Sequence, residues 1–591
     1  MPFKSLRRWS ARIAVSLLAV SGAPPTAFAG GNSAQGDEQQ SEPAKPVASA
    51  GFPDIALIHY AETSGRGAFL ATDSLTATVT LRAVNTGKVA TGPVSVSVTD
   101  VNSLMKQTSP AQPIGALQPG ESSEPIAIQL AATMPPSKSQ SSETPQFTDW
   151  KNAYDMLCGV DLMAAMVLAT PQPASAAGDR KQEYLYLGYG NSKPWDEGHP
   201  VPMANICDDT QCVSIHHVAR SIYKLIGCKV VGYAFFVGDG LDPSRGILGG
   251  FGEARTRLTP PETWFAPSTK MQIASSSKVL TALASIRVLG PRIEDPAYPY
   301  FPSDWRMPTA SIVKNVTFRQ FLSQTSGVQQ YSAGSLYATA DVLEGFFTQQ
   351  LPNPDAPKSC PGYHANSKNI PNPIVSDHAP CYSNTNFGIM RLALPRAAGD
   401  TTNNPLELAE DYVGQVRDNV FAPVGVQDVG CRPPANPRAT ALLYRYPGDS
   451  VSYDWGDTTP ACGDWGWYVS VEDYAKVLLS LNSGDHRILT DCQFFDMETN
   501  PASHPVGWDV KADGPTRRWL EKNGEQIHGS AFQTTSVGIY GGRSGCPSSG
   551  SSPVPGVAGV LFIDSDISGQ PNAGAWTVLT RAFRSAVTPK P

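Results

Sequence analysis

The stretch QIASSSKVLTALASIRVLG, residues 272–290, constrains the fold of this chain more than any other segment. Three serines and a lysine come early in it, and the apolar residues that follow recur at the spacing of an α-helix. Those that share one helical face are Val279, Leu280, Leu283 and Ile286. The pattern predicts a buried helix whose first turn is polar.

Ser275 and Lys278 are separated by one helical turn at the start of this helix. At that spacing the hydroxyl and the amine lie on the same face, within hydrogen-bond reach, whereas Ser276 and Ser277 miss this register. A serine is a poor nucleophile alone, but a lysine serves as its base when burial and a second positive charge lower the lysine pKa. A helix N-terminus also suits the oxyanion that forms when a serine attacks a carbonyl. The turn predicts either a nucleophilic serine or only the polar start of a buried helix.

The spacing of serine and lysine is common by itself. It occurs again at Ser103/Lys106, Ser221/Lys224 and Ser311/Lys314. Because only Ser275 opens a strongly apolar helix, we expect the chemistry there.

The length of 591 residues exceeds what one hydrophobic core supports, so two or more domains are expected. Charged residues make up 16% of the chain, below the roughly 25% usual for soluble domains. This composition favours a loop-rich extracellular protein. The formal net charge of -7 gives no basic footprint, so a nucleic acid partner is not expected.

Residues 1–29 have the layout of a secretory signal peptide. Basic residues come first, an apolar run covers residues 13–20, and Ala27-Phe28-Ala29 forms an A-x-A cleavage site. We expect cleavage near Ala29 and a secreted or periplasmic mature protein. No later run approaches the roughly 18 apolar residues of a membrane span, so none is expected.

Ten cysteines, all between Cys158 and Cys546, predict disulfide bonds and an oxidising compartment. The pairs that bracket short loops, and are therefore plausible bridges, are Cys207 with Cys212 and Cys360 with Cys381. The full pairing cannot be deduced from the sequence.

No metal or other cofactor is expected. The cysteines form no C-x-x-C pair of the kind that binds zinc. The adjacent His216 and His217 face different ways on a helix, and no carboxylate is spaced to coordinate with them.

The composition and the hydrophobic pattern change several times along the first half of the chain. Residues 30–47 are polar and Gly/Ser/Pro-rich, which predicts a flexible linker. Residues 48–132 carry short alternating segments at 54–58, 75–81, 94–98 and 126–128, which predict a small immunoglobulin-like β-sandwich. Residues 133–205 are expected to form a connector, and residues 206–591 to carry the chemistry.

An N-T-G turn at residues 85–87 and an L-x-P-G motif at 117–120 resemble those of CARDB and other immunoglobulin-like adhesion modules. A spacer role is favoured for this module over ligand binding.

Several segments of the second half join Ser275 and Lys278 in a larger pattern. They are TFRQFLSQTSG at 317–327, YSNTNFG at 382–388, Lys522-Asn523-Gly524, and a closing order of three strands and a helix. With these segments, residues 213–591 resemble the serine β-lactamase and penicillin-binding-protein superfamily, closest to its class C and esterase branch. The resemblance implies an α/β (α+β) fold in which helices flank an antiparallel sheet.

The resemblance also implies a role for each motif residue. Ser275 would attack an ester or amide carbonyl, Lys278 and Tyr382 would move the proton, and two nearby lysines would lower the Tyr382 pKa. Asn384, Lys522 and Gly524 would bind the substrate, a small ester, amide or peptide, including cell-wall fragments.

The chain departs from the family pattern after Gly524. Glu525 stands where the family has a small residue whose N–H completes the oxyanion hole, and an acid there would oppose an anionic substrate. His528-Gly529-Ser530 is a competing alignment of the third motif.

The activity therefore stays open among esterase, D-alanyl-D-alanine carboxypeptidase and β-lactamase. An alternative of another class is a non-catalytic cell-wall or peptide binding protein.

Overall fold

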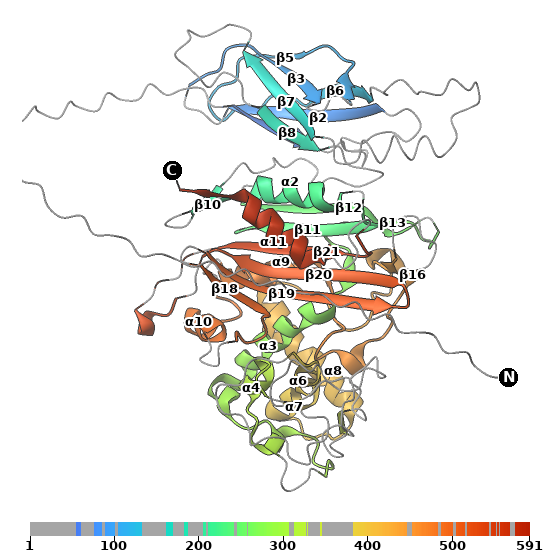
Figure 1. Cartoon of the computed structure of the whole chain (residues 1–591), viewed down its shortest axis with the longest axis vertical. Helices are drawn as coiled ribbons and strands as arrows, with labels where there is room; N and C mark the ends of the chain where they lie inside the picture. Colours follow the sequence, from blue (N-terminus) through green and yellow to red (C-terminus); the bar gives the residue numbers. More distant parts are fainter. Residues whose placement is uncertain are drawn as a thin grey trace, which may run out of the picture. The chain divides into compact units, whose positions relative to one another are not determined.

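The computed structural model (Figure 1) describes two regions of the chain, with gaps. The first comprises residues 55–60, 76–85, 89–100, 105–132, 161–168 and 182–186. The second is 205–590, except for residues 208–210, 228, 242–244, 257, 307–311, 327, 329–342, 345–381, 446–451, 483–485, 500–503, 515–516, 543–544, 551, 553, 555 and 568–573. The expected signal peptide, the expected linker and the pair Cys360 and Cys381 lie outside the described residues.

Two four-stranded antiparallel sheets occupy the N-terminal region. One has the order β1 (Ile55–Tyr60), β2 (Thr76–Asn85), β6 (Ile126–Ala132), β4 (Met105–Gln107). The other has the order β5 (Gln112–Ile114), β3 (Val94–Asp100), β7 (Asp161–Leu168), β8 (Gln182–Tyr186). The last two strands come from the segment expected to be a connector, because the apolar run at 162–168 pairs along β3.

The N-T-G and L-x-P-G motifs of this region meet at Asn85. Its side-chain amide is buried and donates to the carbonyls of Val89 and Leu117. Its backbone exchanges hydrogen bonds with Gly120 and Glu121, and Gly120 has the positive φ of 80° that the turn requires. The two motifs therefore hold two turns together through Asn85. The similarity to CARDB modules stays a prediction.

A seven-stranded antiparallel sheet forms the centre of the C-terminal region (Figure 1). Its order is β13 (Thr263–Trp264), β12 (Gly246–Arg255), β11 (Gly232–Gly238), β21 (Val557–Ile563), β20 (Ala531–Tyr540), β19 (Arg517–His528), β18 (Val510–Gly514). The pairing of β11 with β21 joins segments from the two ends of this region. The segment between β13 and β18, residues 265–509, supplies most of the helices of this region.

Side-chain alternation along β11 and β21 gives the sheet two apolar faces. Tyr233, Phe235 and Leu561 pack with the helices α2 (Ile215–Ile226) and α11 (Ala575–Ala586). Phe236 and Val560 belong to a separate core with α3 (Ser277–Leu289) and α9 (Val471–Asn482). This sheet between two helical layers is the α+β fold that the sequence predicts.

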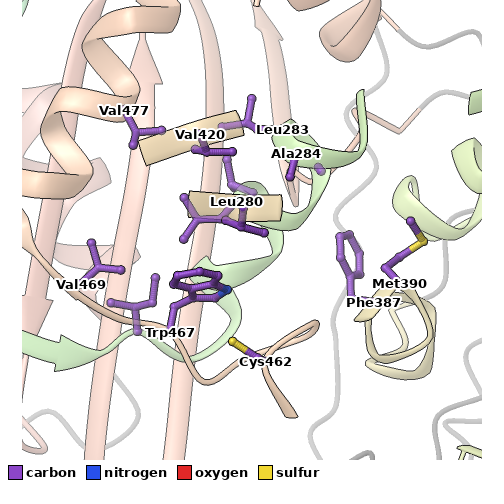
Figure 2. Packing of buried hydrophobic residues seen from close by; sticks show 14 of the residues in the cluster. Leu280, Leu283, Ala284, Phe387, Met390, Val420, Cys462, Trp467, Val469 and Val477 are labelled. Carbon is purple, nitrogen blue, oxygen red and sulfur yellow. The ribbon is translucent and has the colours of Figure 1, made fainter. Parts of the chain in front are cut away.

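The predicted buried helix is α3, and it lies at the centre of the larger core. Leu280 and Leu283 pack with Trp467, with Val477 of α9 and with Val420 of the short π-helical turn Arg417–Phe421 (Figure 2). Because α3 is buried nearly all round, its polar first turn is held by core packing at a fixed position beside β19.

The remaining elements surround α3 or close the ends of the domain. The helices are α4 (Phe318–Leu322), α6 (Thr385–Gly388), α7 (Met390–Ala397), α8 (Pro405–Val416) and α10 (Asp491–Thr499). The small sheets pair β14 (Lys270–Gln272) with β17 (Tyr468–Ser470), β15 (Leu443–Tyr444) with β16 (Ser452–Tyr453), and β10 (Gln211–Ser214) with β9 (Asn205–Cys207) and β22 (Val587–Pro589).

Disulfides join three cysteine pairs among the described residues: Cys207–Cys212, Cys431–Cys462 and Cys492–Cys546. Cys207–Cys212 is one of the two bridges that the sequence predicts, and it is confirmed; it links β9 to β10. Among the helices that the structure describes, none is long and apolar enough to cross a membrane.

Candidate active site

Ser275 lies in a single 3-10 turn, Ala274–Ser276, between β14 and α3. The residue before it, Ala274, is buried and has φ of 46°, in the left-handed region that costs a residue with a Cβ roughly 1–2 kcal/mol. Neighbouring contacts hold this conformation: the Ile273 N–H donates to the Trp467 carbonyl, and the Ala274 N–H donates to the Gln272 side chain. The turn thus presents Ser275 in a strained, fixed backbone.

The structure brings Ser275, Lys278, Tyr382 and Asn384 into one hydrogen-bonded cluster. The Ser275 Oγ lies 2.9 Å from the Lys278 Nζ and 2.6 Å from the Tyr382 Oη. The Asn384 Oδ1 accepts hydrogen bonds from Lys278 at 2.7 Å and from Tyr382 at 3.0 Å. The serine hydroxyl therefore has a lysine on one side and a phenol on the other.

Lys278 is completely buried, and its amine also donates to the Asp464 carbonyl at 2.6 Å. Burial, followed by the positive charge of Lys522, lowers the pKa of Lys278 to about 7, and the carboxylates of Asp464 and Asp509 oppose this shift. A large part of the lysine is thus neutral near pH 7, so its nitrogen can accept the serine proton.

Tyr382 differs from the expectation of a lowered pKa. Its pKa is raised, first because its hydroxyl is withdrawn from water and second because the Asp509 carboxylate is nearby. The amines of Lys278 and Lys522 lie 5.1 and 4.8 Å from its ring centre, but they do not outweigh these causes. Although 44% of the residue is exposed, its hydroxyl is engaged by Ser275 and Asn384 and stays protonated near neutral pH.

The third predicted motif reaches the serine from strand β19. Lys522 is buried with its amine over the Tyr382 ring, and burial lowers its pKa. Gly524 passes so close that an added Cβ would lie 2.6 Å from the Ile273 carbonyl and 2.9 Å from the Ser275 nitrogen. A glycine is required at this position because a side chain would collide with the nucleophile turn.

The competing alignment places its histidine elsewhere. His528 ends β19 at the turn into β20, where its ring stacks on Tyr453 with centroids 3.4 Å apart and meets Trp455 at a steep angle. The segment Lys522-Asn523-Gly524, rather than His528, faces Ser275.

Asp509 is a site residue that sequence reasoning missed. Its carboxylate forms an ion pair with the Lys522 amine. The β18–β19 hairpin pairs Val510 with Glu521, and continuing that register places Asp509 opposite Lys522 on the same face. Asp513-Gly514, a dipeptide common in hairpins, ends β18, and it could have pointed to this pair had the hairpin been predicted.

Glu525 does not project towards the serine, although its negative charge is among the smaller causes that raise the pKa of Tyr382. Along β19, Glu521 accepts a hydrogen bond from Thr580 of α11, so the odd-numbered side chains face that helix. A Cβ built on Gly574 would lie 2.5 Å from the Glu525 Oε1, which places this carboxylate beside the start of α11. The acid that reaches the Lys522 side is Asp509.

A second layer fixes the loop that carries Tyr382. The Gln324 side chain accepts from the Ser383 N–H at 2.9 Å and from the Asn386 amide at 2.6 Å. Ser326 donates to Asn386 at 2.5 Å. Gln324 and Ser326 of the motif at 317–327 therefore orient the tyrosine loop.

The chain was compared with known protein families and structures. Residues 248–542 match the beta-lactamase family model. The chain belongs, through this region, to the beta-lactamase family. No curated protein matches the chain.

Similar solved structures include a beta-lactamase/D-alanine carboxypeptidase from Yersinia pestis complexed with citrate. It is 17% identical over 63% of this chain and 94% of that one, with a TM-score of 0.42. A class C beta-lactamase from Rhodobacter sphaeroides is 15% identical over 63% of this chain and 99% of that one, with a TM-score of 0.40. FmtA from Staphylococcus aureus is 14% identical over 63% and 89%, with a TM-score of 0.43.

The described part of this beta-lactamase-family chain contains no group of three or more His, Cys, Asp or Glu side chains that could hold a metal ion. His216 on α2 is partly exposed, and withdrawal of its ring from water lowers its pKa to about 4. The neighbouring His217 is partly buried.

Proposed function

We propose that the chain is a secreted serine hydrolase that cleaves an ester or amide bond through an acyl-enzyme on Ser275. The observation that carries this proposal is the position of the Ser275 hydroxyl between the Lys278 amine and the Tyr382 phenol, at 2.9 and 2.6 Å. Membership of the beta-lactamase family supports the same reaction class.

In the first half-reaction, the Ser275 oxygen bonds to the substrate carbonyl carbon while its proton passes to the neutral Lys278 amine. The negative charge on the carbonyl oxygen is stabilised by the N–H of Ser275. The scissile C–O or C–N bond then breaks, and the leaving group takes a proton from the Tyr382 hydroxyl, which regains one from Lys278. An acyl ester on Ser275 remains.

In the second half-reaction, water attacks the acyl ester and gives its proton to the Lys278 and Tyr382 pair. The Ser275 oxygen leaves the carbonyl carbon, recovers that proton, and the acid is released. Asn384 holds Lys278 and Tyr382 in register through both halves, since it accepts from each of them. Lys522 and Gly524 line the substrate side of the turn.

Secretion is part of the proposal. The predicted signal peptide and the disulfides among the described residues support an oxidising compartment. We assign the two N-terminal sheets to a spacer module, which takes in β7 and β8 from residues 133–205 as well as residues 48–132, and residues 206–591 to the catalytic domain.

Covalent labelling tests the proposal. Purified protein is incubated with a fluorescent penicillin and, separately, with a fluorophosphonate probe, and the modified residue is located by peptide mass spectrometry. We expect an adduct at Ser275 that is lost in Ser275→Ala and kept in Ser221→Ala, whose serine has the same spacing to a lysine. A penicillin adduct favours a cell-wall or β-lactamase activity, and a fluorophosphonate adduct alone favours an esterase.

The absence of any adduct in folded protein would reject the hydrolase and favour the non-catalytic binding protein. An adduct on another serine would reject the assignment of the nucleophile.

A further inference from the structure

The cation nearest to Tyr382 on strand β19 is already paired with a carboxylate of the protein. Lys522 is buried, with its amine 4.8 Å from the Tyr382 ring centre, and Asp509 forms an ion pair with it. A substrate carboxylate that approached this amine would share it with the Asp509 carboxylate and be repelled by the like charge. A neutral or positively charged group would meet no such repulsion.

The backbone that carries Asp509 is fixed by hydrogen bonds. Its own N–H donates to the Glu521 carbonyl at 2.9 Å, which continues the β18–β19 pairing. Just before it, the N–H groups of Val506 and Gly507 donate to the Met497 and Leu322 carbonyls, each at 2.9 Å. The backbone on both sides of the carboxylate is therefore anchored.

Packing adds to these backbone contacts. Trp508, next to Asp509, is 1% exposed in the core. Gly507 has φ of 79° and lies so close to α3 that an added Cβ would be 2.6 Å from the Ala282 side chain. The loop that carries Asp509 is thus fitted against the helix that carries Lys278, and Asp509 keeps a fixed place beside Lys522.

The other charges near the serine do not restore an anion site. Lys278 has a pKa of about 7, so it carries little charge above neutral pH, and its amine is occupied by Ser275, Asn384 and the Asp464 carbonyl. The Asp464 carboxylate adds a negative field at the same lysine. Above pH 7 the net charge of the side chains around Ser275 is therefore zero or negative.

We propose that the cleft selects esters or amides in which the group that reaches Lys522 is uncharged or cationic, and that Asp509 is the residue that sets this selection. This inference rests on the proposed hydrolase function. It assigns a substrate class that excludes compounds recognised through a carboxylate, such as penicillins and peptides ending in D-Ala-D-Ala.

The test uses matched aryl esters and the full chain. One series carries a carboxylate, a carboxamide or a trimethylammonium group at the same position of the leaving phenol, and a second series carries these groups on the acyl part. We expect kcat/KM for the carboxylate ester to be at least about tenfold below that of the carboxamide in one of the series, as like-charge repulsion in a partly buried cleft predicts. In Asp509→Asn we expect that gap to close.

Two control variants identify the responsible acid. Asp496→Asn removes a carboxylate of α10 that pairs with Arg319 of α4, and it should leave the ratio unchanged. Glu525→Gln removes an acid whose side chain lies beside the start of α11, and it should change the ratio less than Asp509→Asn does. A preference for the carboxylate ester in the wild-type protein, or an unchanged ratio in Asp509→Asn, would overturn the inference, as would a ratio altered by Glu525→Gln alone.

Binding to Ser275→Ala separates this inference from the proposed function. Titration calorimetry with the intact esters measures charge preference without catalysis. Tighter binding of the carboxamide and trimethylammonium esters with no turnover by the wild-type protein would reject the hydrolase and keep the charge selection. Turnover with a preference for the carboxylate ester would keep the hydrolase and reject the charge selection. A failure of Ser275→Ala to bind any of the esters would also reject the charge selection.

Discussion

The Lys278 amine donates a 2.6 Å hydrogen bond to the backbone carbonyl of Asp464, 186 residues later in the chain. With Ser275 and Asn384, this carbonyl completes three partners for a fully buried amine. These three partners therefore fix the position of the amine at the end of a flexible side chain. A buried amine with this low pKa is positioned to act as a base from the first step.

Replacing Lys278 by Ala should reduce the rate of Ser275 acylation by a factor on the order of 100 to 10,000, the usual contribution of a general base. Stopped-flow labelling with the probe that modifies the wild-type protein gives this rate. Lys224→Ala removes the exposed lysine of another Ser-x-x-Lys sequence, on α2, and should acylate at the wild-type rate. The opposite pattern in the two variants would discard the motif assignment.

The pH dependence of acylation should follow the ionisation of Lys278. The base is the neutral amine, and its pKa of about 7 lies below the ordinary 10.5 of a lysine. The logarithm of the acylation rate should therefore rise with pH up to about 7 and level off above it. A rate that continued to rise to pH 10 would contradict a lowered pKa.

Asp509 should tune this pH profile, because its negative charge favours the protonated form of Lys278. In Asp509→Asn the midpoint of the acylation profile should move to lower pH. Asp496→Asn, whose carboxylate pairs with Arg319, should leave the midpoint in place. A shift to higher pH in Asp509→Asn would show that the carboxylate acts on the lysine in some other way.

Tyr382→Phe removes one hydroxyl and keeps the ring that lies against Lys522. We expect kcat/KM for a good ester to fall by about 100-fold, because the leaving group then lacks its proton donor. The loss should be smaller for esters whose leaving phenol has a low pKa, since such a phenolate departs without a proton. An equal loss across a series of leaving groups would indicate a role for Tyr382 in structure alone.

Local spacing was enough to predict the helix α3 and the approach of Lys278 to Ser275, since both depend on helical geometry within one turn. The loop of Tyr382 and the strand of Lys522 were recognised only by resemblance, because 107 and 247 residues separate them from the serine. The direction of the Tyr382 pKa was wrong because it depends on burial and on Asp509, which tertiary structure alone brings together.

Other site features have no local signal. Nothing in the sequence marks Ala274 for a left-handed backbone, which the surrounding contacts impose on it. Glu525 looked like a residue of the cleft because it follows Gly524, yet strand alternation turns its side chain to α11. The side of a strand becomes readable only when its register with a known neighbour is fixed.

Gly524→Ala should disable the site while leaving the fold intact. The added Cβ would lie 2.6 Å from the Ile273 carbonyl and 2.9 Å from the Ser275 nitrogen, so the nucleophile turn has to shift. A displacement of about 1 Å at a reacting group costs on the order of 100-fold in rate, and we expect a loss of that size in kcat/KM.

Gly414→Ala is the matched control for this variant. Gly414 lies within α8 with no atom within 4 Å of an added Cβ, so activity should be unchanged and the free energy of unfolding should rise by roughly 0.5–1 kcal/mol. Thermal unfolding and ester turnover measured on both variants separate the two effects. Wild-type activity in Gly524→Ala would mean that β19 does not restrain the serine, and the assignment of Lys522-Asn523-Gly524 as the third motif would fail with it.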